Sequence, residues 1–272
     1  MVLNFQRNDA SYSPEKREQV NRLNTKMIER VVHPYNLQKA VEQVVSNKGS
    51  AGVDGIKTSQ LKTLFPKRKD QLLEAIRQGN YQPQPILGVE IPKGEGKTRL
   101  LGVPTTTDRV LQQAVSQVIA PLFEPEFSHN SFGFRPNKNA RQAVGQARDY
   151  IHQGLNHIVD IDLKNFFDEV DHCLLLNLVY QKVKCKTTMR LIRNWLRVPI
   201  QIKGKLQKRR KGVPQGGGAL RKCPVDIFSE RASRRAGKGR ERISYDWALT
   251  KTTLMLLAEP VKAVGQLRRV LS

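Results

Sequence analysis

Two aspartates at alternate positions, Asp160 and Asp162, stand in the stretch Ile158–His172, where residue types and spacing could support metal chemistry. The β-branched run around them predicts a strand, and alternate residues of a strand lie on the same face. A third acid, Asp168, follows two phenylalanines. Carboxylates at the end of a strand are hard oxygen ligands of the kind that hold Mg²⁺. The alternative interpretation is a strand and turn whose acids are solvated at a sheet edge.

The charge balance favours a polyanionic partner. The 272-residue chain has 47 lysines and arginines against 24 acids, a net charge of +23. Such a surplus is typical of nucleic-acid binding, because unneutralised self-repulsion destabilises a compact fold. An anionic membrane is the competing partner. However, no apolar run approaches the roughly 20 residues that span a bilayer, and no basic amphipathic helix with an aromatic apolar face supports surface binding.

Composition and the N-terminus predict a soluble globular protein of one large or two modest domains. Met1–Ser13 lacks the apolar core of a signal peptide, so we expect a cytoplasmic location. The cysteines, Cys173, Cys185 and Cys223, have no metal-ligand spacing and are odd in number. They indicate structural thiols in a reducing compartment.

The elements that must position the aspartates are mostly helical. Apolar residues recurring at three- and four-residue steps predict the following helices: residues 14–32, 37–45, 61–79, 109–120, 139–151, 174–183 and 188–196. Gly79 is predicted to cap the third helix, and Thr107–Arg109 the fourth. The buried stripe of the fourth helix is predicted to comprise Val110, Leu111, Ala114, Val115 and Val118.

A basic hairpin precedes the fourth helix. Val89–Pro92 and Arg99–Pro104 are predicted strands, and they flank a glycine-containing tip that carries Lys93 and Lys97. These lysines and Arg99 could clamp phosphates, because lysine supplies a point charge and arginine a bidentate fork. The alternative is a solvated basic hairpin.

Two further segments combine basic and conformationally special residues. Ser131–Lys138 interleaves phenylalanines with Arg135, which suits base stacking, although the aromatic rings could equally be core. Ile200–Ile202 and the strongly basic Gln207–Lys211 are predicted to pair as a hairpin. The following Gly212–Gly218 can approach a substrate closely, with Gln215 as its one polar side chain.

Five blocks, in this order, resemble the reverse transcriptases (maturases) of bacterial group II introns, members of the retron-type RNA-directed DNA polymerase family. They are Gly52–Gly55, Ile91–Lys93 through Leu101–Pro104 with Asp108 and Arg109, Phe127–Pro136, the Asp162 block, and Gly212–Gly217. The resemblance covers roughly residues 30–220. It implies an α+β fold: the fingers and partial palm of a right-hand polymerase, an antiparallel sheet with packed helices, and no thumb. The expected domains are an N-terminal helical extension (1–50), fingers (51–155), partial palm (156–220) and an aberrant basic tract (221–272).

The resemblance also assigns roles to residues. It implies that Asp162 and the carbonyl of Leu163 bind catalytic Mg²⁺. It implies nucleotide contacts for Lys93, Arg99, Phe166 and Gln215, with Phe166 under the sugar of the incoming nucleotide. The residues expected to contact nucleic acid are Arg135, Lys138, Lys208, Arg209 and Arg210.

The chain departs from the family after Leu220. The family expects a Tyr-x-Asp-Asp hairpin as the second half of the metal site, and no Asp-Asp pair occurs in the sequence. A frameshift is one hypothesis. Back-translated and read two nucleotides later, residues 249–254 permit Tyr-x-Asp-Asp-Ala. In the frame as it stands, residues 251–272 are predicted as a helix. A palm that stops before its second metal hairpin would leave sheet edges unpaired.

We therefore expect an RNA-directed DNA polymerase that transfers nucleotides with two metals, copies RNA into DNA and binds intron RNA. Its expected partners are group II intron RNA, an RNA template, a DNA primer and dNTPs, without a membrane. The missing Asp-Asp predicts a truncated, weakly active or inactive form. One alternative is a non-catalytic RNA-binding maturase remnant that assists splicing. The other is a nonspecific basic DNA-binding protein.

Overall fold

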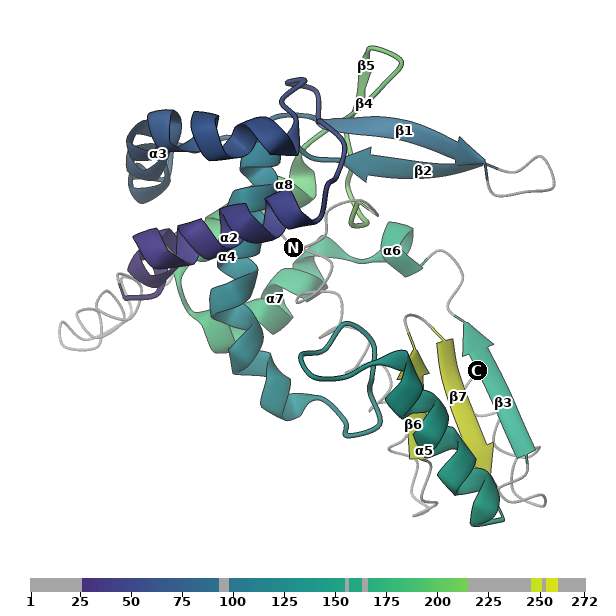
Figure 1. Cartoon of the computed structure of the whole chain (residues 1–272). Coiled ribbons are helices and arrows are strands. Elements are labelled where there is room, and N and C mark those ends of the chain that lie inside the picture. The colour runs from purple at the N-terminus through teal and green to yellow at the C-terminus, as the bar shows by residue number, and fades with distance from the viewer. Residues whose placement is uncertain are drawn as a thin grey trace. The chain divides into compact units, whose positions relative to one another are not determined.

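A computed structural model of the whole chain gives the architecture (Figure 1). It describes residues 26–92, 98–154, 157–162, 166–214, 246–250 and 253–258. For 157–162, 166, 246–250 and 253–258 the description covers the backbone alone. The chain divides into two compact units, which interleave in sequence: Met1–Phe123 with Phe167–Asp226, and Glu124–Phe166 with Ile227–Ser272. The domain bounds given above stay a prediction.

The first unit combines helices with a four-stranded sheet. Its helical parts are residues 26–32, α2 (Pro34–Ser46), the 3₁₀ turn η1 (Thr58–Gln60), α3 (Leu61–Gln78), α4 (Thr106–Phe123), α7 (His172–Val183) and α8 (Lys186–Arg197). The sheet has the order β2-β1-β4-β5, from β1 (Ile86–Pro92), β2 (Thr98–Val103), β4 (Ile200–Ile202) and β5 (Lys205–Gln207). β1 pairs antiparallel with β2 and parallel with β4.

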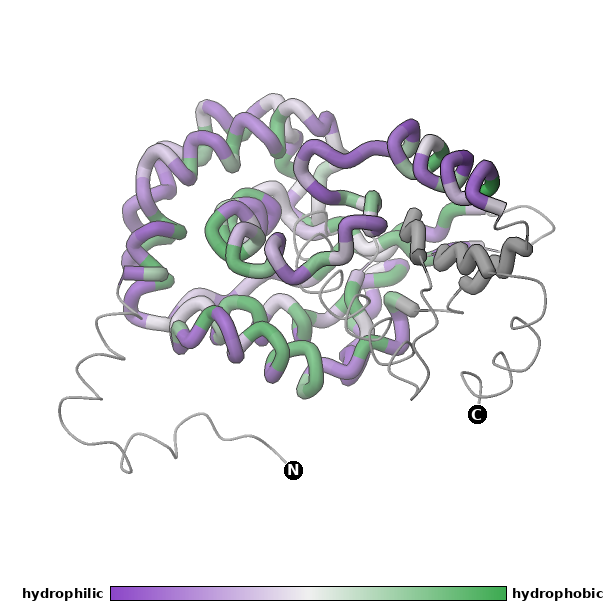
Figure 2. Tube along the Cα trace, turned by 90° about the horizontal axis from the view of Figure 1, so that it is seen from below, coloured by the Kyte–Doolittle hydropathy of each residue, from purple (hydrophilic) through white to green (hydrophobic). Residues whose placement is uncertain are grey.

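Helix α4 lies at the centre of this unit, packed against α2, α3 and α7 (Figure 1). All five apolar residues of its predicted stripe are buried, because an apolar residue every third or fourth position lines one side of a helix. Hydrophobic and hydrophilic segments alternate along the helical tubes in Figure 2, the pattern expected of helices that each bury one side. The predicted stop of α3 is also confirmed: Gly79 has φ +75° at its C-cap.

The second unit is a helix on a three-stranded antiparallel sheet. It contains η2 (Glu124–Glu126), α5 (Ala140–His152) and the sheet β3-β7-β6, formed by β3 (His157–Asp162), β6 (Asp246–Thr250) and β7 (Thr253–Ala258). Helix α5 packs against β6. A short helix, α6 (Phe166–Glu169), joins the two units in sequence. Together the two units confirm the predicted α+β class. None of the helices among the described residues is long and apolar enough to cross a membrane.

The C-terminal part differs from the sequence prediction. Residues 253–258, predicted to be helical, form β7, and β7 pairs with β3 along its whole length. The helix predicted for these residues was therefore wrong. The run Leu254–Leu257 is continuously apolar, so periodicity alone could not distinguish a buried strand from a helix. The remaining residues of the predicted helix lie outside the described residues.

Two smaller predictions were also wrong. The predicted hairpin that begins at Ile200–Ile202 is confirmed, with its turn at Lys203 and Gly204. Its second strand was predicted too long, because β5 ends at Gln207 and Lys208–Lys211 do not continue it. Helix α4 is capped by Thr105 rather than by 107–109: the Thr105 hydroxyl accepts a hydrogen bond from the backbone N–H of Asp108 at 3.2 Å. Asp108 instead points inward.

The buried carboxylate of Asp108 joins three separate parts of the first unit. The side chain of Asp108 accepts hydrogen bonds from the Tyr81 hydroxyl at 2.7 Å, Trp195 Nε1 at 3.0 Å and the Thr105 hydroxyl at 2.8 Å. The backbone N–H of Gln84 donates to it at 3.3 Å. Burial raises the pKa of Asp108, while these donors oppose the shift by favouring the carboxylate.

We expect Asp108→Ala to lower the free energy of unfolding by about 3 kcal/mol, because buried donors of Tyr81 and Trp195 would lose their acceptor. Urea unfolding followed by tryptophan fluorescence measures this. The control is Asp70→Ala on α3, where the side chain is 93% exposed and the expected change is within about 0.5 kcal/mol. Equal effects of the two substitutions would contradict the role given to Asp108.

Candidate functional site

The strand prediction around the two aspartates is confirmed. Asp160 and Asp162 lie in β3, with Asp162 as its last residue. Across the ladder, Asp160 is opposite Met255 and Asp162 is opposite Thr253. Because alternate residues of a strand share a face, the two aspartates lie on one side of the three-stranded sheet.

In the described part of the hairpin beside β3, no acidic residue lies opposite Asp162. The hairpin's one acid among the described residues, Asp246, is opposite Leu257, and Leu257 is opposite Ile158. Ile158 is four residues before Asp162, which is about 13 Å along a strand. Within the described ranges, no group of three or more His, Cys, Asp or Glu residues is placed to hold a metal ion. These donors do not fit the two-metal clamp that the resemblance implies.

In the first unit, the start of the Gly212–Gly218 segment is held against residues 167–172. We call this arrangement, residues 167–172 with Gly212 and Val213, the strap. The N–H of Gly212 donates to the carbonyl of Val170 at 2.8 Å, and that of Val213 donates to the carbonyl of Phe167 at 2.7 Å. Gly212 has φ +83°, and a Cβ there would lie 2.7 Å from the carbonyl oxygen of Asp168. A glycine is therefore required, both for its backbone conformation and for this close approach.

His172, the first residue of α7, completes the strap. Its ring is buried, and Nε2 lies 2.7 Å from the carbonyl oxygen of Gly212. A carbonyl only accepts, so Nε2 carries the proton. Burial lowers the pKa of His172; the positive charges of Arg209 and Arg197 lower it further, while the bond to Gly212 and the charge of Asp171 oppose this. The ring is therefore held in its neutral form.

The basic residues beside the strap differ in what they offer a ligand. Lys208 and Arg210 are exposed, whereas Arg209 is partly buried and donates to the carbonyl of Leu196 at 3.3 Å. Burial lowers the pKa of Arg209, opposed by the charge of Asp168. Lys211 forms an ion pair with Glu169. Lys208 and Arg210 are thus the residues of this run best placed to contact phosphates.

The side chains of Arg135 and Lys138, in the second unit, contact other residues of the protein. Arg135 is 10% exposed at its side chain, pairs with Glu124 at 2.8 Å and donates to the carbonyls of Ser128 and Ser131. Its guanidinium also lies over the Phe127 ring at 5.3 Å. The Lys138 ammonium donates to the carbonyl of His129 and lies 4.7 Å from the Phe132 ring centroid. These contacts stabilise the loop before α5, and a nucleic-acid role for the two residues stays a prediction.

The remaining predicted site residues are placed as follows. Arg99 is exposed on β2, opposite Ile91. Phe166 begins α6, described by its backbone alone. Lys93, Leu163 and Gln215 lie outside the described residues, although Gln215 directly follows Pro214, which is buried. Nucleotide contacts for these residues therefore stay a prediction.

Sequence reasoning assigned no site role to Asp108, Tyr81, Trp195 or His172. Buried aspartate and histidine side chains need polar partners, and these partners lie 27 to 87 residues away in the chain. A usable signal was present for His172, which ends the aspartate stretch that the sequence singles out, and for Asp108, which belongs to one of the blocks of the resemblance.

Residues 91–219 match the family of reverse transcriptases (RNA-dependent DNA polymerases). The chain is also similar to the group II intron-encoded protein LtrA of Lactococcus lactis subsp. cremoris, at 29% identity over 75% of this chain and 34% of LtrA. Protein YkfC of Escherichia coli (strain K12) is 30% identical over 71% of this chain and 52% of YkfC. The chain thus spans about half or less of these relatives.

The fold agrees with a solved structure. A chain of the partial Cas6-RT-Cas1–Cas2 complex superposes with a TM-score of 0.53 at 20% identity, covering 86% of this chain and 38% of that one. Similarity at this level of identity shows the fold alone. It accords with a partial reverse-transcriptase fold.

We expect Thr253→Asp to create metal affinity, because directly opposite residues of an antiparallel pair lie about 5 Å apart and share a face. Mn²⁺ binding, measured by electron paramagnetic resonance, should be stronger in Thr253→Asp than in the natural chain. Thr250→Asp, at the end of β6, is the matched control: it adds the same charge to a strand that does not neighbour β3. Equal Mn²⁺ binding by both variants would contradict the observed register.

We expect the stability that neutral His172 contributes to be fully present above the ordinary histidine pKa of about 6.5. It should be lost as the pH falls from there through the lower folded-state pKa, because the unfolded chain binds the proton more readily. Urea unfolding between about pH 7.5 and 5.5 should show a steeper fall for the natural chain than for His172→Gln. The control is exposed His152→Gln, and a fall unchanged by His172→Gln would contradict this assignment.

Proposed function

We propose that this chain binds group II intron RNA as a reverse-transcriptase-type protein and that its own DNA synthesis is weak or absent. The observation that carries the RNA-binding part is the family match over residues 91–219 in a chain of net charge +23. Homology to the intron-encoded LtrA supports an intron RNA as the partner. Lysine and arginine side chains bind phosphates and release counterions, so affinity should fall steeply with salt.

The described residues support different parts of this function. Lys208 and Arg210 supply exposed positive charge beside the strap, and Arg99 supplies it on β2. The strap would hold the Gly212–Gly218 backbone ready for a nucleotide, with Gln215 lining the pocket. Lys93 would join Arg99 on the triphosphate, and Phe166 would lie under the sugar. An RNA template and a DNA primer would be the nucleic-acid partners.

The proposed weakness in synthesis rests on the donor set. Nucleotidyl transfer by this family's mechanism would need Mg²⁺ held by more carboxylates than Asp162 and Asp160 provide. The paired ends of β6 and β7, Thr250 and Thr253, fall within residues 249–254, the stretch whose shifted frame permits Tyr-x-Asp-Asp-Ala. This position supports the frameshift hypothesis and, with it, a remnant that assists splicing as the second candidate function.

We expect the chain to bind structured RNA with strong salt dependence and to extend a primer on poly(rA)/oligo(dT) with Mg²⁺ at no more than background. Asp162→Ala should leave RNA affinity unchanged. Lys208→Ala with Arg210→Ala should reduce the slope of log affinity against log salt by about 2. The control, Arg141→Ala with Arg148→Ala on α5, removes equal charge elsewhere.

Primer extension that Asp162→Ala abolishes would overturn the proposed inactivity while leaving RNA binding intact. An equal fall in slope for both double variants would favour diffuse electrostatic binding. Binding of duplex DNA as tight as that of RNA would favour a nonspecific basic protein.

A further inference from the structure

A cavity of about 550 Å³ in the first unit lies between one side of α3, the loop at 54–56, the segment 81–84 and the start of α4. This volume falls within the roughly 300–1,000 Å³ typical of small-molecule sites. Arg68, Gln71 and Leu72 line it from α3, where positions three and four apart share one side. Gln82 and Gln84 line it from the extended segment.

Four polar side chains at this cavity have no protein partner. Arg68, Gln71, Gln82 and Gln84 are exposed, and among the described residues their side chains make no hydrogen bond or ion pair. Elsewhere on α3 the comparable groups are engaged: Gln78 donates to Glu74 at 2.7 Å. Three unpaired carboxamides and one guanidinium therefore converge on a single cavity.

The backbone that carries two of these amides is fixed before any ligand binds. The carbonyl of Tyr81 accepts from Asn194 Nδ2 at 3.2 Å, and the N–H of Gln84 donates to Asp108 at 3.3 Å. Pro83 and Pro85 restrict the backbone between and after the glutamines to extended conformations. Binding would therefore order side chains but little backbone, which lowers its entropic cost.

The chemistry of these groups suits an unpaired nucleotide. A carboxamide offers both a donor and an acceptor, which matches the edge of a nucleobase. Leu72, beside Gln71, supplies apolar surface for the face of the base, and the Arg68 guanidinium can pair with phosphate. The carboxylates of Asp54 and Asp108 also line the cavity. Because they would repel phosphate, they direct the sugar-phosphate toward Arg68.

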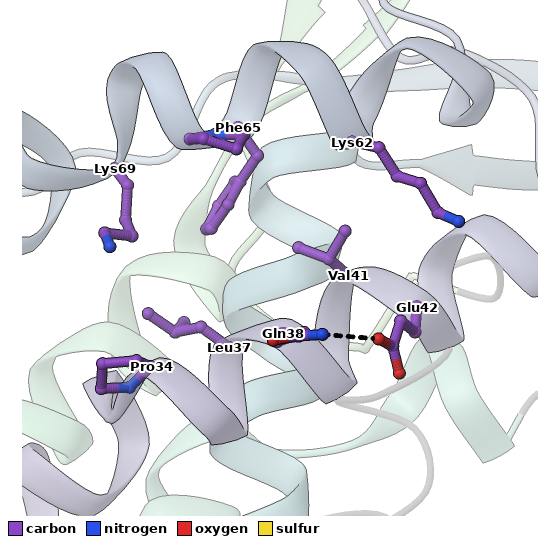
Figure 3. Close-up of a pocket in the computed structure, with 9 residues that line it drawn as sticks. Pro34, Leu37, Gln38, Val41, Glu42, Lys62, Phe65 and Lys69 are labelled. Atoms are coloured by element: carbon purple, nitrogen blue, oxygen red, sulfur yellow. Dashed lines mark hydrogen bonds between the residues drawn. The ribbon is translucent and has the colours of Figure 1, made fainter.

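A second cavity of this unit has different chemistry. It measures about 420 Å³ and lies between α2 and α3 (Figure 3). Its interior is apolar, around Leu37, Val41 and Phe65, and its one amide, Gln38, donates to Glu42 at 3.0 Å. It offers no unpaired amide to read a base.

We propose that the cavity between α3 and the segment 81–84 binds one unpaired nucleotide of single-stranded RNA, with Gln71, Gln82 and Gln84 reading the base and Arg68 holding a phosphate. This inference rests on the proposed RNA-binding function and adds a base-selective site to it. The segment from Asn80 to Pro85 thus presents base-contacting side chains on a backbone that its hydrogen bond to Asp108 holds in place.

The test uses the full chain and single-stranded RNAs of A, C or U, each about 12 nucleotides long, with affinity measured by fluorescence anisotropy at fixed salt. The natural chain should prefer one base. In the triple variant Gln71→Ala, Gln82→Ala, Gln84→Ala, the ratio of the affinity for the preferred RNA to that for the other RNAs should fall about tenfold. Arg68→Ala should weaken binding of all three RNAs by about fivefold, as expected for one phosphate contact.

Matched controls lie on the same helix outside the cavity. Lys67→Ala removes an exposed charge next to Arg68, and Gln78→Ala removes an exposed amide; both should preserve the base preference, and Lys67→Ala should weaken binding less than Arg68→Ala. A natural chain that binds RNA without base preference, or variants equal to the controls, would overturn the nucleotide site alone. Absence of any RNA binding by the natural chain would overturn the proposed function as well.

Discussion

The carboxylate of Asp108 is the constraint on which the first unit depends. An acid buried in an apolar interior is costly unless donors surround it, and here four donors converge from Thr105, Tyr81, Gln84 and Trp195. They fix the start of α4, the segment before β1 and helix α8 relative to one another. The β1–β4 pairing, with Ile86 opposite Ile200, follows from bringing these chain segments together.

A second set of contacts fixes the segment nearest the expected nucleotide. Backbone bonds tie Gly212 to Val170 and Val213 to Phe167, and the neutral ring of His172 holds the Gly212 carbonyl. Because Gly212 is in the left-handed region against the backbone of Asp168, no side chain fits there. The strap thus gives a precise start to a glycine-rich stretch that would otherwise have wide conformational freedom.

Binding and catalysis depend on different features of this chain. Affinity for RNA needs distributed positive charge and a few preorganised polar groups, and both are present among the described residues of the first unit. Nucleotidyl transfer by two metals needs several carboxylates within one coordination sphere. The register places Thr253, which has no carboxylate, opposite Asp162. Under the proposed function, RNA affinity can therefore persist in this fold without two-metal chemistry.

The sequence by itself determined what depends on neighbouring residues: the stripe of α4, the glycine stop of α3 and the strand that carries Asp160 and Asp162. The α+β class was an implication of the resemblance carried by the ordered motifs. Periodicity and capping are local, so they can be read from adjacent positions. Only the tertiary structure decided which distant groups meet. Asp108, predicted to help cap a helix, is a buried hydrogen-bond acceptor. Arg135 pairs with Glu124, and Thr253–Ala258 pairs with β3. The physical reason is that burial and strand pairing depend on residues far apart in the chain, where local pattern carries no signal.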